Sequence, residues 1–521
     1  MSTAEESLEP AVHEDGFGRA SDFLNPILVK ETRQALKSRA FVSVFLLMLI
    51  ASWLISSIGV LYAYGPELSY SAAGRSFFTA FYTVLSIAVF IVVPQGAFRS
   101  IQSERELQTF EMLTITTLSP RKIVWGKWWS AAVQTIVYYA AIAPFMVFTN
   151  LLRGISLPFI AFVLFWSFIG SVCLAMVAIT FSTFTKQRQA FGLLQFLLVM
   201  PLVTSLISML QVMYQFSGDE LPYDQPLFWF AQLIIVSLLI PAFVLFRQIA
   251  TANLTFEGAN RSTGIRISCA LLLAISLFWL LLLTDSGLLP TSITMGSSMP
   301  VESIIGAATV IGIWLWLVGL FTSTEDDRLS RRVRQELPRR SLVRLVVLPL
   351  YPGGGRGFLY FSLSVFIYAA VGLYLIAASS GTYDEKIKSQ LMLVALASYL
   401  FFYIGVTSFA GRMIRRIGTD LHAAHARVLG ILIASTGVIG PFLFVFWDYR
   451  FPQTVPALMI TNPFYSCYQL MHDSGSAPPL VGIIGLGALG LLLNAKNMLV
   501  GVREFLTTSP NVPTTTTTQS V

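Results

Sequence analysis

RSIQSERELQTFEMLTITTLSPRKIVWGK, residues 99–127, is the one long charged run between two strongly apolar segments in the first half of the chain. No Gly or Pro interrupts it from Ile101 to Ile115, and its Glu, Leu, Gln, Met and Arg favour helix, so the run predicts a short amphipathic helix. Ser119 then suits a helix N-cap, and Pro120 suits the first position of a new helix. We therefore expect a polar helix folded back by a Ser-Pro corner against the mouth of the next membrane-spanning helix.

Composition places the chain in a membrane. Of its 521 residues 55% are hydrophobic and only 12% are charged, whereas soluble domains carry about 25% charged residues. The mean hydropathy is +0.70, and a run of roughly 20 apolar residues can cross about 30 Å of hydrocarbon. We predict an all-α polytopic membrane protein with about 12 transmembrane helices as six plus six, at residues 41–62, 77–98, 128–150, 157–183, 190–214, 226–248, 267–284, 302–321, 358–380, 389–411, 428–447 and 478–499.

The predicted organisation has four parts. Residues 1–20 form a polar, acidic tail without the basic and apolar regions of a signal peptide. A first six-span half occupies residues 21–266 and ends in a polar linker at 249–266. A second six-span half occupies residues 267–500. Residues 501–521, which include the TTTTTQSV run, are expected to be a disordered tail.

The distribution of basic residues predicts the orientation. Loops on the cytoplasmic side of a membrane are enriched in Lys and Arg. With the N-terminus in the cytosol, almost all of the 34 Lys and Arg fall on the inner side, and the exceptions are Arg75, Arg153, Lys386, Lys388 and Arg450. We therefore predict an even number of spans, both termini in the cytosol, and location in a cell membrane. Topology accounts for the net charge of +7, so no nucleic-acid partner is expected.

An interfacial helix is predicted before the first span. Asn25 suits its N-cap and Pro26 its first position. Its cations cluster on one face, at Lys30, Arg33 and Lys37, where they would lie near lipid phosphates. Glu31 falls on the apolar side, which conflicts with this interpretation.

Residues 99–127 also carry a family resemblance. They are similar to the stretch between the second and third spans of ABC-2 type permeases of ATP-binding-cassette transporters, through Glu104-Arg105-Glu106, Thr109-Phe110-Glu111-Met112-Leu113, Thr116-Thr117-Leu118-Ser119-Pro120 and Gly126-Lys127. Gln108 stands where that family usually has Gly, and Thr117 where it has Pro. The resemblance covers roughly residues 20–250, and it includes the interfacial helix, which the family calls an elbow helix.

The resemblance implies a coupling helix that binds an ATPase. A separate ABC ATPase subunit, which would hold ATP and Mg, would dock on residues 104–118. The implied coupling residues are Glu104, Arg105, Glu106, Leu107, Thr109, Phe110, Glu111, Leu113, Leu118, Ser119 and Pro120. Since an ATPase pair offers two grooves and the chain has one clear coupling stretch, a homodimer or a pair with a related permease is expected. The resemblance implies that the chain is the membrane-spanning permease subunit of an ABC-2 type transporter, which exports a substrate that the sequence does not identify.

The chain itself has no Walker A sequence. No Ser-His-Asp, zinc or paired-carboxylate pattern appears in its aqueous segments. We therefore expect no catalytic residue, no cofactor-binding residue, no metal site and no enzymatic activity in this chain.

The segment 322–357 occupies the same topological place in the second half as 99–127 does in the first. It lacks the Glu-Arg-Glu and Leu-Ser-Pro pattern. Either it is a basic loop held near anionic lipid, which we favour, or it is a diverged second docking surface. Its Pro352–Gly355 run lacks the Gly-Lys-Ser/Thr of a phosphate loop and is interpreted as a flexible hinge.

Two other functions stay open. The chain could be a non-transporting membrane scaffold or regulatory protein derived from an ABC-2 permease. An ion-coupled carrier is less favoured, because no Lys, Arg, Asp or Glu lies in the middle of a predicted span. Some spans do hold polar residues, which either line a substrate route or, as we favour, form hydrogen bonds between helices: Gln134, Tyr138, Tyr139, Asn150 and Gln195.

Overall fold

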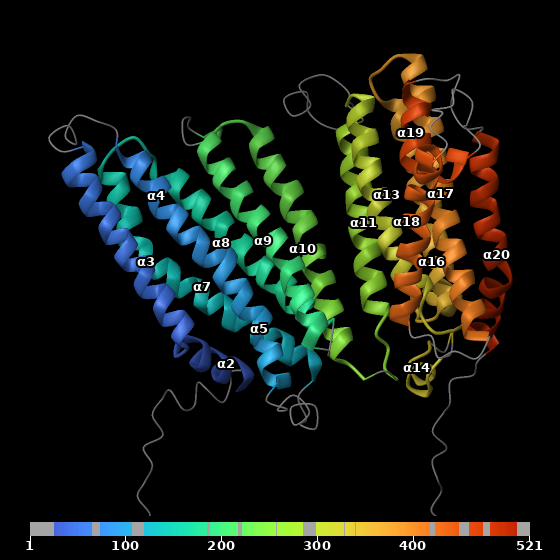
Figure 1. Ribbon diagram of the computed structural model, residues 1–521, viewed down its shortest axis with the longest axis horizontal. Coiled ribbons are helices and arrows are strands. Elements are labelled where there is room, and N and C mark those ends of the chain that lie inside the picture. The colour runs from blue at the N-terminus through green and yellow to red at the C-terminus, as the bar shows by residue number, and fades with distance from the viewer. Residues whose placement is uncertain are drawn as a thin grey trace, which may run out of the picture. The chain divides into compact units, whose positions relative to one another are not determined.

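The computed structural model describes most of the chain (Figure 1), namely residues 26–64, 73–106, 119–184, 188–216, 221–256, 258–284, 299–327, 329–338, 340–416, 423–447, 458–472 and 480–507. Within these residues the regular structure is helical, apart from one isolated bridge between Pro300 and Ser380. Twelve of the described helices are long and apolar enough to cross a membrane. Each overlaps one predicted span, so the all-α polytopic fold and the number of spans are confirmed.

The chain divides into two compact units. Unit 1 contains Met1–Pro222 and Phe246–Thr255, and unit 2 contains Tyr223–Leu245 and Phe256–Val521. The described helices of unit 1 are α2 (Pro26–Leu36), α3 (Arg39–Ile58), the π-helix η1 (Gly59–Tyr64), α4 (Gly74–Ile87), the π-helix η3 (Ala88–Val92), α5 (Val93–Glu106), α7 (Pro120–Leu151), α8 (Leu157–Thr183), α9 (Arg188–Phe216) and the end of α10 (Pro226–Leu254).

The second span runs further than predicted. Helices α4, η3 and α5 form one continuous run over residues 74–106. The π turn of η3 ends two residues before Pro94, whose missing N–H cannot complete a regular helical ladder. Helix is confirmed for residues 101–106, but these residues are the last turns of α5 and do not begin a separate helix. The rest of that prediction, residues 107–118, lies outside the described residues.

The described helices of unit 2 begin with the first part of α10. The others are α11 (Thr263–Thr284), α13 (Val301–Ser323), α14 (Arg331–Gln335), α15 (Ser341–Val347), the 3-10 helix η4 (Leu348–Leu350), α16 (Gly354–Ala378), α17 (Tyr383–Arg416), α18 (Ala423–Trp447), the 3-10 helix η5 (Leu458–Thr461), α19 (Pro463–His472) and α20 (Leu480–Thr507). The predicted linker 249–266 is too long, because α10 continues to Leu254 and α11 begins at Thr263.

Small residues allow α17 and α20 to pack closely. A Cβ atom added to Gly405 would lie 2.5 Å from the Cα of Gly490, and one added to Gly487 would lie 2.9 Å from the Cα of Ser398. Helices in lipid gain little from apolar burial against each other, so close backbone contact supplies much of their packing energy. These glycines therefore set the distance between the two helices.

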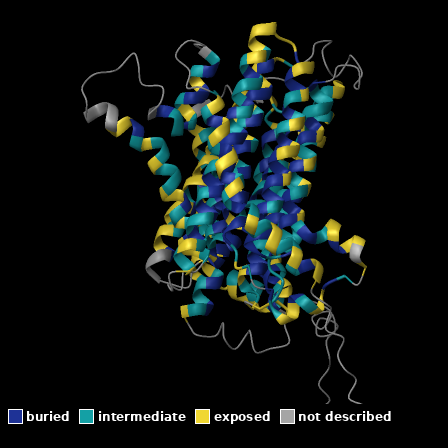
Figure 2. Cartoon of the chain, turned by 90° about the vertical axis from the view of Figure 1, so that its right-hand side faces the viewer, coloured by how far each residue is buried: buried dark blue, intermediate teal, exposed yellow. Residues whose placement is uncertain are grey.

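Both units expose large apolar side chains, as a bilayer requires. Leu47 on α3 is 68% exposed and Val310 on α13 is 67% exposed. Buried and exposed residues alternate along the full length of the long helices (Figure 2). Such outer faces suit hydrocarbon, so a lipid bilayer is the environment that these helices fit.

The C-terminal helix extends into the predicted tail. Helix α20 continues to Thr507, so residues 501–507 are helical and not disordered. Phe505 is fully buried in an apolar cluster that also contains Leu329, Val333, Leu337, Leu348 and Tyr351. The remaining tail predictions, for residues 1–20 and 508–521, lie outside the described residues.

Candidate functional site

The predicted coupling residues are only partly described. Glu104, Arg105 and Glu106 form the end of α5, and Ser119 and Pro120 begin α7. The others lie outside the described residues: Leu107, Thr109, Phe110, Glu111, Leu113 and Leu118. Of the elbow helix, Asn25 also lies outside, while Pro26, Lys30, Arg33 and Lys37 are on α2.

The start of α7 has the predicted Ser-Pro geometry. Ser119 is the N-cap residue in an extended conformation, and Pro120 is at the first helical position. The Ser119 carbonyl accepts a hydrogen bond from the Lys122 amide at 2.9 Å. The predicted cap position is therefore confirmed, although the Ser119 side chain makes no capping hydrogen bond.

A buried ion-pair network joins three helices of unit 1. Lys127, on α7, is 2% exposed. Its Nζ lies 2.9 Å from Glu31 Oε1 on α2 and 3.2 Å from Glu104 Oε1 on α5. The same ammonium donates to the Ser100 carbonyl at 3.3 Å, and Lys30 lies 3.7 Å from Glu104. The network therefore joins α2 to the end of α5 and the start of α7.

This network explains why Glu31 lies on the apolar side of the predicted interfacial helix. Because α2 packs on α7, its inward face must hold a partner for Lys127, and Glu31 supplies the carboxylate. Lys30, Arg33 and Lys37 are exposed. The sequence analysis did not predict this network, although Glu31 pointed to it. A carboxylate that is buried on an apolar helix face needs a cation nearby.

The three charged residues at the end of α5, Glu104, Arg105 and Glu106, lie in different surroundings. Glu104 faces inward and is 6% exposed. Arg105 is half-buried and donates from Nη1 to the Ser182 carbonyl of α8 at 3.3 Å. Glu106 is exposed and accepts a hydrogen bond from Gln102 at 2.8 Å. Among these three residues, Glu106 is thus the one placed to meet a partner in water.

Aromatic residues lie next to Lys127 in the first turns of α7. The ring centroids of Trp125 and Trp128 lie 4.9 Å apart, and those of Trp128 and Trp129 lie 4.8 Å apart. Trp128 Nε1 donates to the Val172 carbonyl of α8 at 3.0 Å. The guanidinium of Arg247 lies 5.5 Å from the Trp125 ring. Tryptophan is favoured at membrane–water boundaries, so this belt is consistent with α7 entering the bilayer here.

A second buried polar cluster lies in unit 2. Arg266, at the start of α11, is fully buried, and its Nη2 lies 2.6 Å from Glu325 Oε2. The same carboxylate oxygen accepts a hydrogen bond from the Gly353 amide at 3.1 Å. Arg356 is buried as well, and its Nη1 lies 3.6 Å from Glu504 on α20. These contacts join α11, the end of α13, the start of α16 and the end of α20.

The predicted flexible hinge at Pro352–Gly355 is wrong. Gly353 has a φ of +136°, which favours glycine. A Cβ on Gly354 would lie 2.7 Å from the Glu325 carbonyl oxygen, and one on Gly355 would lie 2.6 Å from the Asn497 carbonyl oxygen. The glycines therefore allow backbones to approach closely, and the run is a packed junction.

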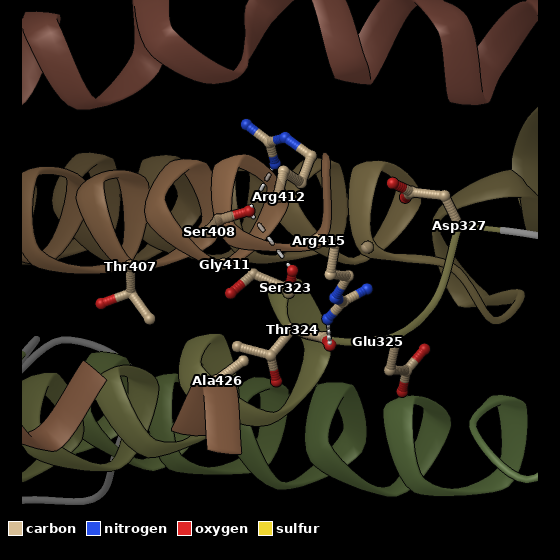
Figure 3. Close-up of a pocket in the computed structure, with 11 residues that line it drawn as sticks. Ser323, Thr324, Glu325, Asp327, Thr407, Ser408, Gly411, Arg412, Arg415 and Ala426 are labelled. Atoms are coloured by element: carbon tan, nitrogen blue, oxygen red, sulfur yellow. Dashed lines mark hydrogen bonds between the residues drawn. The ribbon is translucent and has the colours of Figure 1, made fainter. Parts of the chain in front are cut away.

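A small pocket opens beside this cluster, between the ends of α13, α17 and α18 (Figure 3). Arg412 donates to Ser408 Oγ at 2.7 Å, and Arg415 donates to the Thr324 carbonyl at 2.8 Å. The pocket has room for about one water molecule.

The five polar residues of the spans make different contacts. Tyr139 donates to the Leu164 carbonyl of α8 at 3.2 Å, and Gln195 donates to Gln95 at 3.2 Å. These two confirm the predicted hydrogen bonds between helices. Gln134 bonds within its own helix and Asn150 bonds to the following loop, so for them that prediction is wrong. Tyr138 has no hydrogen-bond partner among the described residues.

No family model matches the chain, and no curated protein or solved structure matches it either. The resemblance to ABC-2 permeases rests on the residues quoted above.

Proposed function

We propose that this multi-pass membrane protein is the permease subunit of an ABC-2 type transporter. A separate ATPase, which holds ATP and Mg, docks on residues 104–118 and powers export of a substrate. Both termini lie in the cytosol, and a second permease copy or a related permease completes the transporter.

The buried network around Lys127 is the observation that carries the proposal. A coupling segment must transmit force, so it needs rigid connections to the spans on both of its sides. Lys127 joins the helix that enters the segment, α5, to the helix that leaves it, α7. Through Glu31 it also joins both to the elbow helix. The described motif residues, Glu104–Glu106 and Ser119–Pro120, therefore lie on the same helices as the network, α5 and α7.

In the proposed mechanism, nucleotide-driven closure of the ATPase pair displaces residues 107–118. Glu106 and Glu111 make polar contacts to the ATPase. The Ser119–Pro120 corner passes the displacement into α7, and Lys127 makes α2 and α5 follow. Two discrete arrangements of packed helices then provide the inward-open and outward-open states.

The test is co-purification of an ATPase with the tagged full-length chain from its native membrane. Reversing two charges, Glu106→Lys and Glu111→Lys, should lower the recovery of a Walker-A ATPase about tenfold or more, because like charges would then meet at the interface. Glu104 is unsuitable for this test because it is buried against Lys127.

Glu336→Lys is the matched control, since Glu336 is an exposed carboxylate on the other cytoplasmic segment. It should leave ATPase recovery unchanged. Equal recovery from the double variant would contradict docking on residues 104–118. Recovery of the wild-type chain without any ATPase would contradict the transporter proposal and favour a scaffold.

A further inference from the structure

Helix α15 in unit 2 exposes an apolar face at the end of the membrane-spanning helices. Leu342 is 78% exposed and Val346 is 76% exposed, and Leu345 between them is also exposed. Positions i, i+3 and i+4 share one face of a helix, so the three side chains form one continuous apolar strip.

The opposite side of α15 is fixed to the protein. Arg344 is buried, and its Nε donates to the Pro338 carbonyl at 2.5 Å. Val347 packs on the apolar cluster of Phe505, together with Leu359 of α16 and Val502 of α20. Leu359 lies in the second turn of α16, so α15 is held within about two turns of the point where α16 enters the apolar layer.

Exposed cations precede the apolar strip in the chain, on α14 and at the N-cap of α15. Arg331, Arg332 and Arg340 are exposed, and Glu336 is the one exposed carboxylate among the described residues from 329 to 347. An apolar strip flanked by arginines at the level of helix ends is the pattern of a helix that lies in a membrane interface. Basic residues in this position attract anionic headgroups.

We propose that α15 is an interfacial helix. Its strip of Leu342, Leu345 and Val346 enters the edge of the bilayer, and the three arginines hold anionic lipid headgroups at that surface. The strip enters the leaflet at which α13 ends, at Ser323, and α16 begins, at Gly354. The distribution of Lys and Arg predicts that this leaflet is cytoplasmic. The proposal stands independently of any transport function.

Spin labels on the full-length chain in nanodiscs test the depth of the strip. The background lacks the native cysteines, of which Cys269 and Cys467 are buried and Cys173 is half-buried. Labels at Leu342→Cys and Val346→Cys should collide several-fold more often with oxygen than with a water-soluble nickel chelate. The control label at Gln335→Cys, an exposed position on α14, should show the reverse.

Either of two results would overturn the proposal. Labels at 342 and 346 that meet the nickel chelate freely would place the strip in water. Labels protected from both reagents would place it under protein, such as an ATPase. If the cysteine-free chain does not fold, a photoactivatable acyl-chain probe on the unmodified chain gives the same answer. It should label residues 341–347, and failure to do so would count against the proposal.

A separate measurement tests whether the arginines hold anionic headgroups. In phosphatidylcholine discs with roughly 30% phosphatidylglycerol, the label at 342 should lie deeper than in phosphatidylcholine alone. Raising NaCl from about 0.05 to about 0.5 M should remove that difference, because salt screens surface charge. The triple variant Arg331→Gln, Arg332→Gln, Arg340→Gln should also remove it. Equal depth in both lipids would overturn the assignment of anionic headgroups.

Discussion

The Lys127 ammonium satisfies all three of its donors inside unit 1. Glu31, Glu104 and the Ser100 carbonyl surround it at 2.9, 3.2 and 3.3 Å. A lysine ammonium has three N–H donors and no acceptor, and a buried charge is tolerated only when its partners are placed well. The three helices that supply these groups are therefore held in one arrangement.

Lys127→Met should destabilise the protein by about 3–5 kcal/mol, because it leaves two carboxylates buried without their shared cation. The measurement is the midpoint of thermal unfolding in nanodiscs. Lys37→Met, which removes an exposed cation from α2, should change stability by less than about 0.5 kcal/mol.

A double variant separates charge from packing. Lys127→Met combined with Glu104→Gln should be more stable than Lys127→Met alone, since one uncompensated carboxylate is removed. Equal stability of the single and double variants would show that Lys127 contributes through its methylene chain and not through its charge.

At the scale of elements, close backbone contact decides how α20 packs. A Cβ on Gly490 would lie 2.2 Å from the Phe401 carbonyl oxygen of α17. Backbone atoms within a helix cannot rotate away as a side chain can. Gly485 is on the same helix, and a Cβ there would meet nothing within 4 Å.

Gly490→Ala should therefore destabilise the protein by about 1–3 kcal/mol through overpacking. Gly485→Ala should leave stability unchanged or raise it by up to about 1 kcal/mol, because alanine favours helix. Thermal unfolding of both variants in the same detergent makes the comparison. Two equal midpoints would show that α17 and α20 separate without cost.

Two elements also show where local pattern misleads. A glycine run suggests flexibility when read alone, yet Gly353 to Gly355 make a packed junction. A polar C-terminal sequence suggests disorder, yet α20 continues to Thr507 because Phe505 finds an apolar cluster. In both cases the partner lies far away in the sequence, so no local pattern could reveal it.

At the scale of the whole molecule, the number of spans constrains the topology. Twelve candidate spans are an even number, so a chain that uses all of them has both termini on one side. The bias of Lys and Arg predicts that this side is the cytosol.

Green fluorescent protein fused to either terminus should therefore fluoresce, and alkaline phosphatase fused there should be inactive. The phosphatase inserted after Gly154, in the turn between α7 and α8, should be active and serves as the control. Active phosphatase at one terminus alone would mean that an odd number of helices crosses the membrane.

The sequence by itself determined the membrane class, the twelve spans and the start of α7 at Ser119–Pro120. These features depend on local physics: the thickness of hydrocarbon sets the length of an apolar helix, and proline suits the first position of a helix. The tertiary structure alone decided which polar groups meet. Glu31 and Lys127 are 96 residues apart, and Arg266 reaches Glu325 across 59 residues. Such pairs depend on how helices pack, because only packing removes the water that would otherwise solvate each charge separately.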